Sequence, residues 1–293
     1  MINQFLNYLR YERNASPQTV QTYEESLREF ESYLGFRDDS LSLDRVDTDL
    51  IRDWMEGLMD KGNTASTINK KLSALRSFYR FSLKRRLVDA DPAHCITGPK
   101  KSKPLPQFLR ESEMDRLLDT VEWGEDYKDV CARTILLLLY EAGLRRSELT
   151  GLDDGDIDFA TRQLKVTGKR NKQRIIPFGE ELSQMLRHYM AVRDEQTVRT
   201  DGHALFIDDK GGRMTGHQVY AIVRKNLATV TSLKKRSPHV LRHTFATAML
   251  NNGAGLESIK NLLGHKSVST TEIYAHTTFE QLKRVYKEAH PRA

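Results

Sequence analysis

Apolar residues recur every three or four positions through the first hundred residues, the spacing of one face of a helix. The clearest run contains Val20, Leu27 and Leu34 and follows Ser16-Pro17, a pair that suits the start of a helix. Similar runs predict three more helices, over 5–9, 50–58 and 68–81. Because short connections separate the four runs, we expect a small helical bundle.

The pattern breaks off at 98–106. This stretch has three prolines and no apolar periodicity, and it carries Lys100, Lys101 and Lys103. Such a composition is typical of a linker between domains. We therefore predict an N-terminal helical domain over 1–97, a linker over 98–106 and a C-terminal domain over 107–293.

The C-terminal domain mixes two periodicities. A continuous apolar run over 130–141, ended by Gly143, predicts a buried helix. Short strands are predicted over 156–159, 163–167 and 173–178, and the last two form a hairpin with Asn171 in its turn. Helices dominate again from Glu180. The predicted fold class is mainly α with a small antiparallel β-sheet, α+β in its second domain.

Charge changes this picture only where it clusters. The chain has 293 residues with 46 Lys+Arg against 40 Asp+Glu, a modest net charge of +6. A modest excess indicates nucleic acid only when basic groups gather. They gather in the linker and on the predicted fourth helix, so the candidates for DNA contacts are Lys70, Lys71, Arg76, Lys100, Lys101 and Lys103. A solvated basic face explains each cluster as well.

Several classes of protein fit the composition poorly. The two cysteines, Cys95 and Cys131, have no metal-binding or disulfide spacing, which fits a reducing cytoplasm. No apolar run is long enough to span a membrane, and no signal peptide is visible. No carboxylate cluster suited to Mg²⁺ stands out, so we expect no metal and no cofactor.

The candidate chemistry lies at successive helix ends between 237 and 274. Ser237-Pro238 opens a helix, which places His239 and Arg242 on one face of its first turn. A second helix, over 256–263, stops at Gly264 and is followed directly by His265. Tyr274 lies on a short helix that a capping box opens. Because the connections are short, these polar side chains can converge on one point.

Residues of these types suit a phosphodiester. Guanidinium groups match the non-bridging oxygens of a phosphate and stabilise a pentacoordinate transition state. A tyrosine becomes a nucleophile when nearby positive charge lowers its pKa and a base takes its proton. The leaving oxygen needs an acid, and a lysine at a hairpin tip suits that role.

Five motifs resemble the tyrosine recombinases, also called the phage integrase family. They are Leu144-Arg145…Ser147-Glu148-Leu149, Thr167-Gly168-Lys169, His239-Val240-Leu241-Arg242-His243, Leu263-Gly264-His265 and Thr271-Glu272-Ile273-Tyr274. The linker, the four N-terminal helices and the His290-Pro291-Arg292-Ala293 terminus look most like the bacterial Xer recombinases. The resemblance covers nearly the whole chain. It implies a SAM-like core-binding domain followed by a catalytic domain.

The resemblance also implies a role for each motif. Arg145 and Arg242 would bind the scissile phosphate, and Lys169 would protonate the leaving 5′ oxygen. His239 would assist proton transfer, His265 would hydrogen-bond the phosphate, and Tyr274 would become the 3′-phosphotyrosine. Exchange would pass through a Holliday junction without ATP. The implied partners are a double-stranded recombination site, further copies or a paralogue in a homotetramer or heterotetramer, and a septal DNA translocase.

Some residues depart from the family pattern. Arg146 is a second candidate beside Arg145, although the register of the Gly-Leu-Arg motif favours Arg145. Lys172 is a rival to Lys169. Ser147 is expected to cap the short helix that follows Arg145. Glu148 suits either the orientation of an active-site group or a helix start.

Three other functions compete with recombination. A type IB topoisomerase-like enzyme would use the same chemistry without exchanging partners, and a DNA-binding regulator would use none. His239 and His243 are four apart, as in a zinc hydrolase, but the zinc-protease motif needs Glu directly after the first His. Chromosome-dimer resolution and the recombination of a mobile element both fit a recombinase.

The C-terminal helix presents an apolar stripe. Thr278 and Gln281 form a capping box that starts a helix at Phe279, and Tyr286 lies on its stripe. The stripe needs a surface, because a helix this short is marginal alone. Periodicity favours the helix's own domain, whereas the resemblance implies docking on a neighbouring protomer. We expect the second arrangement.

Overall fold

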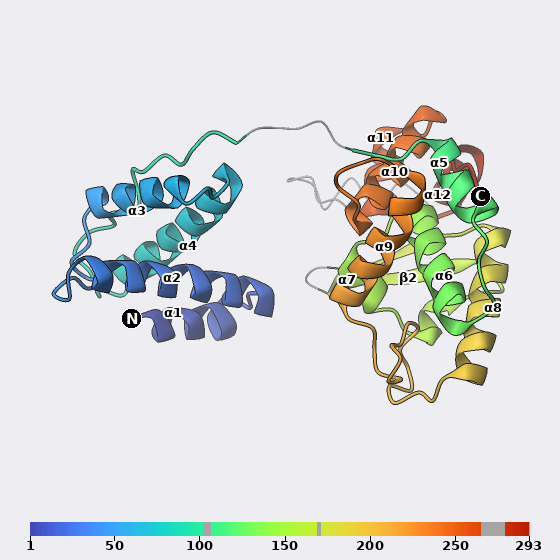
Figure 1. Cartoon of the computed structure of the whole chain (residues 1–293), viewed down its shortest axis with the longest axis horizontal. Helices are drawn as coiled ribbons and strands as arrows, with labels where there is room; N and C mark the ends of the chain where they lie inside the picture. The colour runs from blue at the N-terminus through green and yellow to red at the C-terminus, as the bar shows by residue number, and fades with distance from the viewer. Residues whose placement is uncertain (102–106, 169–170, 265–278, 293) are drawn as a thin grey trace. The chain divides into compact units, whose positions relative to one another are not determined.

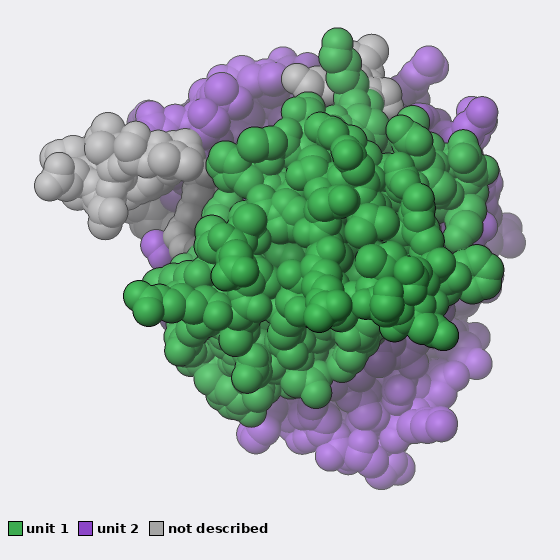
Figure 2. All heavy atoms as spheres, turned by 90° about the vertical axis from the view of Figure 1, so that its left-hand side faces the viewer, with its two compact units in different colours: residues 1–104 green, residues 105–293 purple. Residues whose placement is uncertain are grey.

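The computed structural model describes residues 1–101, 107–168, 171–264 and 279–292. The chain divides into two compact units, 1–104 and 105–293 (Figure 2). Each unit has its own apolar core. The division falls inside the stretch 98–106 that the sequence marks as a linker.

The first unit is a bundle of helices, as the apolar spacing predicts (Figure 1). It contains α1 (Ile2–Asn7), which continues as a π-helical segment (Tyr8–Glu12), α2 (Pro17–Arg37), α3 (Thr48–Asp60) and α4 (Ala65–Lys84). The side chains of Ser16, Asp47 and Thr64 cap α2, α3 and α4, each accepting the backbone N–H three residues further on. These caps fix where each helix begins.

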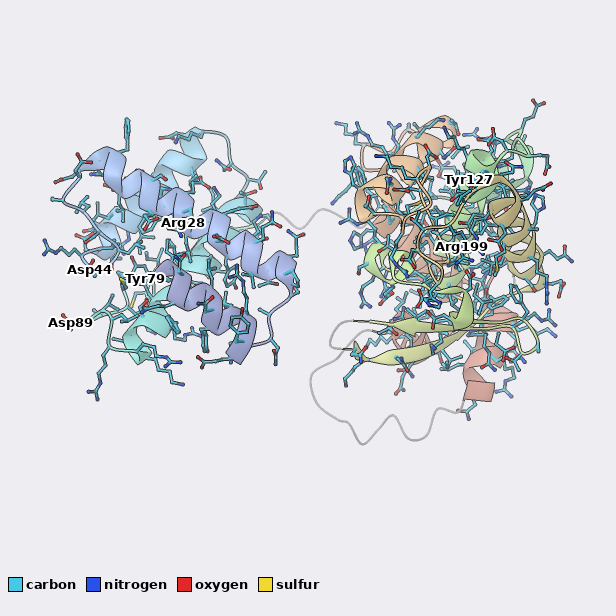
Figure 3. All side chains as sticks on the ribbon, turned by 90° about the horizontal axis from the view of Figure 1, so that it is seen from below. Arg28, Asp44, Tyr79, Asp89, Tyr127 and Arg199 are labelled. Atoms are coloured by element: carbon cyan, nitrogen blue, oxygen red, sulfur yellow. The ribbon has the colours of Figure 1, made fainter. Side chains whose placement is uncertain are left out.

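Aromatic side chains fill the core of this unit. The rings of Phe30 and Trp54 lie 4.8 Å apart between centroids. Tyr79 is fully buried, and its hydroxyl donates to the Leu43 carbonyl at 3.0 Å (Figure 3). Burial raises the pKa of Tyr79. The phenol is therefore a neutral donor that holds the segment between α2 and α3 to α4.

Several basic residues of α4 make contacts inside the unit. Lys71 pairs with Glu29 and lies 5.8 Å from the centroid of the Trp54 ring. Arg76 donates to the carbonyls of Ala93 and Ile96, so it fastens the segment after α4 to the bundle. Lys70, Lys100 and Lys101 are exposed. For these five basic residues, a role in DNA binding stays a prediction. The sixth candidate, Lys103, lies outside the described residues.

The start of the predicted linker is attached to the first unit. The Asn69 side chain on α4 donates to the Pro99 carbonyl at 2.8 Å. Gly98 lies so close that a Cβ there would collide with the Asn69 amide. Gly98 and Pro99, the first two residues of the predicted linker, are therefore held against α4.

The second unit surrounds one buried helix. Its elements are α5 (Glu111–Asp115), a π-helical segment (Arg116–Thr120), α6 (Tyr127–Ala142), α7 (Arg146–Thr150), β1 (Ile157–Asp158), β2 (Gln163–Thr167), β3 (Gln173–Pro177), α8 (Glu180–Gln196), α9 (Gly216–Val230), α10 (Pro238–Asn251), α11 (Leu256–Leu263) and α12 (Phe279–Ala289). Helix α6 is buried on nearly every face and packs against α8, α9 and α10. This confirms the prediction of a buried helix in this part of the chain.

The three strands form one antiparallel sheet in the order β1-β2-β3. Strands β2 and β3 pair from Gln163 opposite Pro177 to Thr167 opposite Gln173. Asn171 adopts φ of 56° in the connection, the left-handed conformation that a tight hairpin requires. The predicted pairing of these two strands is thus confirmed, and Asn171 lies in the connection between them.

The C-terminal helix packs on its own unit in this single chain, whereas its docking on a neighbouring protomer in an assembly stays a prediction. Tyr286 is 2% exposed and donates to the Glu141 carboxyl at 3.2 Å. His290 stacks on Tyr286 with centroids 5.1 Å apart. Arg292 pairs with Glu181 at 2.6 Å and with two aspartates of the 111–120 segment. The apolar stripe therefore meets a surface within the same chain, as periodicity alone favours.

Membrane insertion finds no support in the helices of the described ranges, because none of them is both long and apolar enough to cross a bilayer.

The packing under α12 generates a prediction about pH. Burial, with the nearby charge of Glu181, raises the pKa of Glu141 from 4.5 to about 8. Between these values the unfolded chain releases a proton that the folded chain retains, so stability falls as pH rises. Glu141→Gln removes this dependence. The difference in free energy of unfolding, Glu141→Gln minus wild type, should therefore rise from pH 4.5 to 8 and then level off.

The measurement is denaturant unfolding across pH 4.5 to 9. Glu195→Gln is the matched control, because Glu195 is exposed on α8. Parallel stability curves for Glu141→Gln and wild type would contradict a buried, protonated Glu141.

Candidate active site

Three arginines converge on the C-terminal end of α11. Arg174 Nε donates to the Leu262 carbonyl at 2.8 Å, Arg242 Nη2 to the Leu263 carbonyl at 2.5 Å and Arg145 Nη2 to the Gly264 carbonyl at 3.2 Å. The last carbonyls of a helix have no partner inside it and carry the negative end of its dipole. One helix end thus collects guanidinium groups from three other elements, β3, α10 and the start of α7.

Two glycines make this convergence possible. Gly143 ends α6 with φ of 56°, and a Cβ there would lie 2.6 Å from the Phe245 ring. Gly264 ends α11 with φ of 62°, and a Cβ there would lie 3.1 Å from Arg174 Nη1. Both positions need the left-handed conformation and the space of glycine. The tight turn at Gly143 delivers Arg145 to the site.

Helix α7 begins differently from the expectation. It starts at Arg146, with Arg145 as the N-cap residue, so the expected cap at Ser147 is wrong. Glu148 Oε2 accepts the backbone N–H of Arg145 at 2.8 Å. The carboxylate therefore serves the helix start, and the same group also contacts the arginine side chains.

Glu148 is the anion among the three arginines. Its Oε1 accepts from Arg145 Nη1 at 2.6 Å and from Arg174 Nη1 at 2.9 Å, and its Oε2 accepts from Arg174 Nη2 at 2.9 Å. Burial alone would raise the pKa of Glu148, but the hydrogen bonds and charges of Arg174 and Arg145 outweigh it and hold the pKa at about 2. Glu148 is ionised at neutral pH.

Arg242 is the most enclosed of the three arginines. Only 6% of the residue is exposed, and Nη1 donates to the Gly143 carbonyl at 2.6 Å. Burial and the neighbouring Arg145 lower the pKa of Arg242 to about 10, so it stays protonated at pH 7. Three cations then face one carboxylate, a local charge of about +2. This excess suits an anion such as a phosphate.

His239 lies beside the arginines on the first turn of α10 and is exposed. Partial desolvation and the positive charges of His243, Arg242, Arg146 and Lys235 lower the pKa of His239 below 6.5. A neutral imidazole at pH 7 can accept a proton. The helix begins at Pro238 as predicted, but the Ser237 side chain makes no capping bond.

The adjacent residues Arg145 and Arg146 point to different parts of the second unit. Arg145 contacts Glu148 and the end of α11, in the same cluster as Arg242. Arg146 is exposed and lies over the start of α9, where a Cβ on Gly216 would be 2.9 Å from its Nε. Of the two, Arg145 is the one that the fold brings to Arg242.

Three of the predicted site residues, Lys169, His265 and Tyr274, lie outside the described residues. The residues before them are described: Gly168 N–H donates to the Lys172 carbonyl at 2.7 Å, and Gly264 ends α11. Lys172, the rival of Lys169, is exposed. Within the described ranges no group of three or more His, Cys, Asp or Glu is placed to hold a metal ion.

Sequence reasoning missed Arg174. The available signal was the alternation of β3, which puts Arg174 on the same face as the buried Ile176. A charged residue on the inward face of a strand needs a partner. That partner, Glu148, lies 26 residues away in the sequence.

Comparison with known proteins agrees with this geometry. The model of the phage integrase family matches residues 107–281, and the model of the phage integrase N-terminal SAM-like domain matches residues 2–86. Tyrosine recombinase XerC of Pelotomaculum thermopropionicum is 36% identical over 100% of this chain and 98% of its own length. Tyrosine recombinase XerD of Staphylococcus epidermidis is 33% identical over 100% and 99%.

A solved structure shows the same fold. The XerH site-specific recombinase, bound to palindromic difH substrate in a post-cleavage complex, superimposes with a TM-score of 0.72 at 22% identity. The match covers 97% of this chain and 83% of that one. Family models, full-length relatives and fold agree, and the chain belongs to the phage integrase family of tyrosine recombinases.

Proposed function

We propose that this site-specific recombinase cleaves and rejoins duplex DNA through a 3′-phosphotyrosine intermediate and a Holliday junction, in chromosome-dimer resolution. The observation that supports this best is the Arg145–Arg242 pair, held at the end of α11 with more positive charge than Glu148 neutralises. The proposed parts are a DNA-binding domain (1–97), a linker (98–106) and a catalytic domain (107–293).

The chemistry follows from the groups in the site. Arg145 and Arg242 bind the non-bridging oxygens of the scissile phosphate and stabilise its transition state. The Tyr274 oxygen attacks phosphorus while His239 takes its proton, and His265 hydrogen-bonds the phosphate. Lys169 gives a proton to the departing 5′ oxygen. The phosphotyrosine bond retains the energy of the broken one, so a 5′ hydroxyl of the partner strand religates without ATP or a metal.

The proposed partners follow the XerC and XerD relatives. The chain would act in the cytoplasm on paired double-stranded sites, as a homotetramer or with a paralogue, and a septal DNA translocase would control the exchange. The alternative within the same chemistry is an integrase of a mobile element. A topoisomerase-like enzyme would form the same phosphotyrosine but would not pair two sites.

The test maps covalent protein–DNA adducts across the host genome. Wild type should form adducts at one short locus, whereas Tyr274→Phe should bind the same DNA and form none, because it lacks the attacking oxygen. Adducts in the Tyr274→Phe variant would contradict the assignment of Tyr274 as the nucleophile. Adducts at the ends of an inserted element would indicate an integrase, and scattered adducts a topoisomerase-like enzyme.

Loss of each arginine should separate catalysis from stability. Arg145→Ala and Arg242→Ala should both lose cleavage by about two orders of magnitude or more, while DNA affinity changes modestly, since the pair acts on the transition state. Arg242→Ala should also destabilise the fold by about 2 kcal/mol, because it strands two buried carbonyls.

Arg145→Ala should cost about 1 kcal/mol or less, since that side chain is 34% exposed. Cleavage on a nicked duplex and denaturant unfolding measure the two effects. Equal stability of the two variants would contradict the enclosed position of Arg242.

The general acid is tested by changing the leaving group. A 5′-bridging phosphorothiolate leaves as a thiolate that needs no proton, so this substrate should restore cleavage by Lys169→Ala. Lys172→Ala is the matched variant, because Lys172 lies on the same hairpin. Restoration of Lys172→Ala alone would reverse the two assignments.

A further inference from the structure

Arg174 reaches two parts of the site from a strand that carries none of the proposed catalytic groups. It lies on β3 opposite Val166, and its side chain is 13% exposed. The two terminal nitrogens of the guanidinium donate to the Glu148 carboxylate, each at 2.9 Å, and Nε donates to the Leu262 carbonyl at 2.8 Å. It therefore ties α7 to the end of α11, the two elements on which Arg145 and Arg242 depend.

The hydrogen bonds of Glu148 show what Arg174 does there. A carboxylate offers about four acceptor positions, two on each oxygen. Arg174 occupies one on each oxygen, and the side chain and backbone N–H of Arg145 occupy the other two. Arg242 Nη1 stays 3.8 Å from Oε2, beyond a hydrogen bond. Glu148 is saturated, so Arg242 remains bound to backbone carbonyls instead of to the carboxylate.

Removing Arg174 would change both the geometry and the charge of the site. Two acceptor positions of a buried carboxylate would be vacant, a costly state that the neighbouring guanidinium groups can relieve. Arg145 already contacts Oε1, and Arg242 Nη1 lies 3.8 Å from Oε2 without yet bonding to it. A pair of arginines that turn to Glu148 no longer face a phosphate. The local charge also falls from about +2 to about +1.

The same pair borders the hairpin. A Cβ on Gly168 would lie 3.3 Å from Glu148 Oε1 and 3.8 Å from Arg174 Nη1, so the end of β2 packs directly on the ion pair. Arg174 is thus enclosed by β2, α7 and α11, and its hydrogen bonds in the described structure go to Glu148 and the Leu262 carbonyl. Its position suits a residue that acts through others.

We propose that Arg174 is a positioning residue for the phosphate-binding arginines: by saturating Glu148 and holding the Leu262 carbonyl, it keeps Arg145 and Arg242 directed at the phosphate. The catalytic part of this inference rests on the proposed function. The anion-binding part does not, which lets the two be tested apart.

The first experiment uses inorganic phosphate and no DNA. Phosphate should raise the melting temperature of wild type above that in sodium chloride of equal ionic strength, because an anion fills the charged site. Arg174→Ala should lose most of this increase in melting temperature, and so should Arg145→Ala. Arg174→Lys keeps the charge but cannot reach both Glu148 and Leu262, so it should retain an intermediate increment.

Arg199→Ala is the control for a general loss of stability. Arg199 is 19% exposed, pairs with Asp154 and makes no contact with the three arginines in the described structure. It should keep the full phosphate increment at a lower melting temperature. A full increment in Arg174→Ala, an equal loss in Arg199→Ala, or no increment in wild type would each overturn the proposal.

The second experiment measures cleavage of a nicked duplex carrying the sequence recovered by adduct mapping. Arg174→Ala should cleave about 10- to 100-fold more slowly, the usual effect of removing a group that orients a binding side chain. Its DNA affinity should stay within about twofold of wild type, since it contacts no phosphate. Arg199→Ala should cleave at the wild-type rate where both are folded.

A methylphosphonate at the scissile position separates positioning from general damage. The methyl group replaces a charged oxygen, so the reaction depends less on the arginine pair. The difference in cleavage rate between Arg174→Ala and wild type should therefore become smaller. An unchanged difference would overturn the proposal. If wild type forms no adduct with any duplex, the proposed function fails, and the phosphate experiment still decides the role of Arg174.

Discussion

The site depends on one buried carboxylate held among three guanidinium groups at the end of a helix. Glu148 accepts from Arg145 and Arg174, and the last carbonyls of α11 accept from all three arginines. Charge-assisted bonds of this kind are strong because the surroundings exclude water. They join α7, β3, α10 and α11, which are far apart in the sequence. With the bond from Arg242 to the Gly143 carbonyl, these contacts set the direction of Arg145 relative to Arg242.

The cluster differs from the other arginine network of the same unit in its charge balance. Arg193, Arg199 and Arg213 pair with Asp153, Asp154, Asp194 and Asp201, so the carboxylates outnumber the arginines by one (Figure 3 labels Arg199). The carboxylates of that network neutralise its arginines, so it serves the fold. Around Glu148, one carboxylate faces three arginines. Residues of the same types thus give a structural network in one place and an anion site in the other.

Much of this arrangement could be predicted because its signals are local. Gly143 and Gly264 end helices in the left-handed conformation, and Asn171 turns the hairpin, as their residue types indicate. These turns also set the register that brings Arg145, rather than Arg146, to Arg242. Each signal depends on a few neighbouring residues, which is why the sequence was sufficient.

The misses depend on residues distant in the chain. The role of Arg174 depends on its contacts with Glu148 and the Leu262 carbonyl, which only the folded chain brings together. No residue near Arg174 in the sequence identifies these partners. The contact of α12 with its own unit also joins distant residues, since Glu141 lies 145 residues before Tyr286. The hydroxyl of Ser147 favours it as the cap of α7, but the Glu148 carboxylate accepts the backbone N–H of Arg145, and the helix begins at Arg146.

The central claim is that Arg145 and Arg242, held by Glu148 and the end of α11, form the phosphate-binding site. The most direct test is a crystal structure of the chain with a gapped DNA duplex and orthovanadate, which mimics the pentacoordinate phosphorus. The account predicts nitrogens of both arginines about 3 Å from equatorial vanadate oxygens, with the Glu148–Arg174 bonds intact. Vanadate held by Arg146 and His243 instead, with Arg242 still on its two carbonyls and remote from the anion, would contradict it.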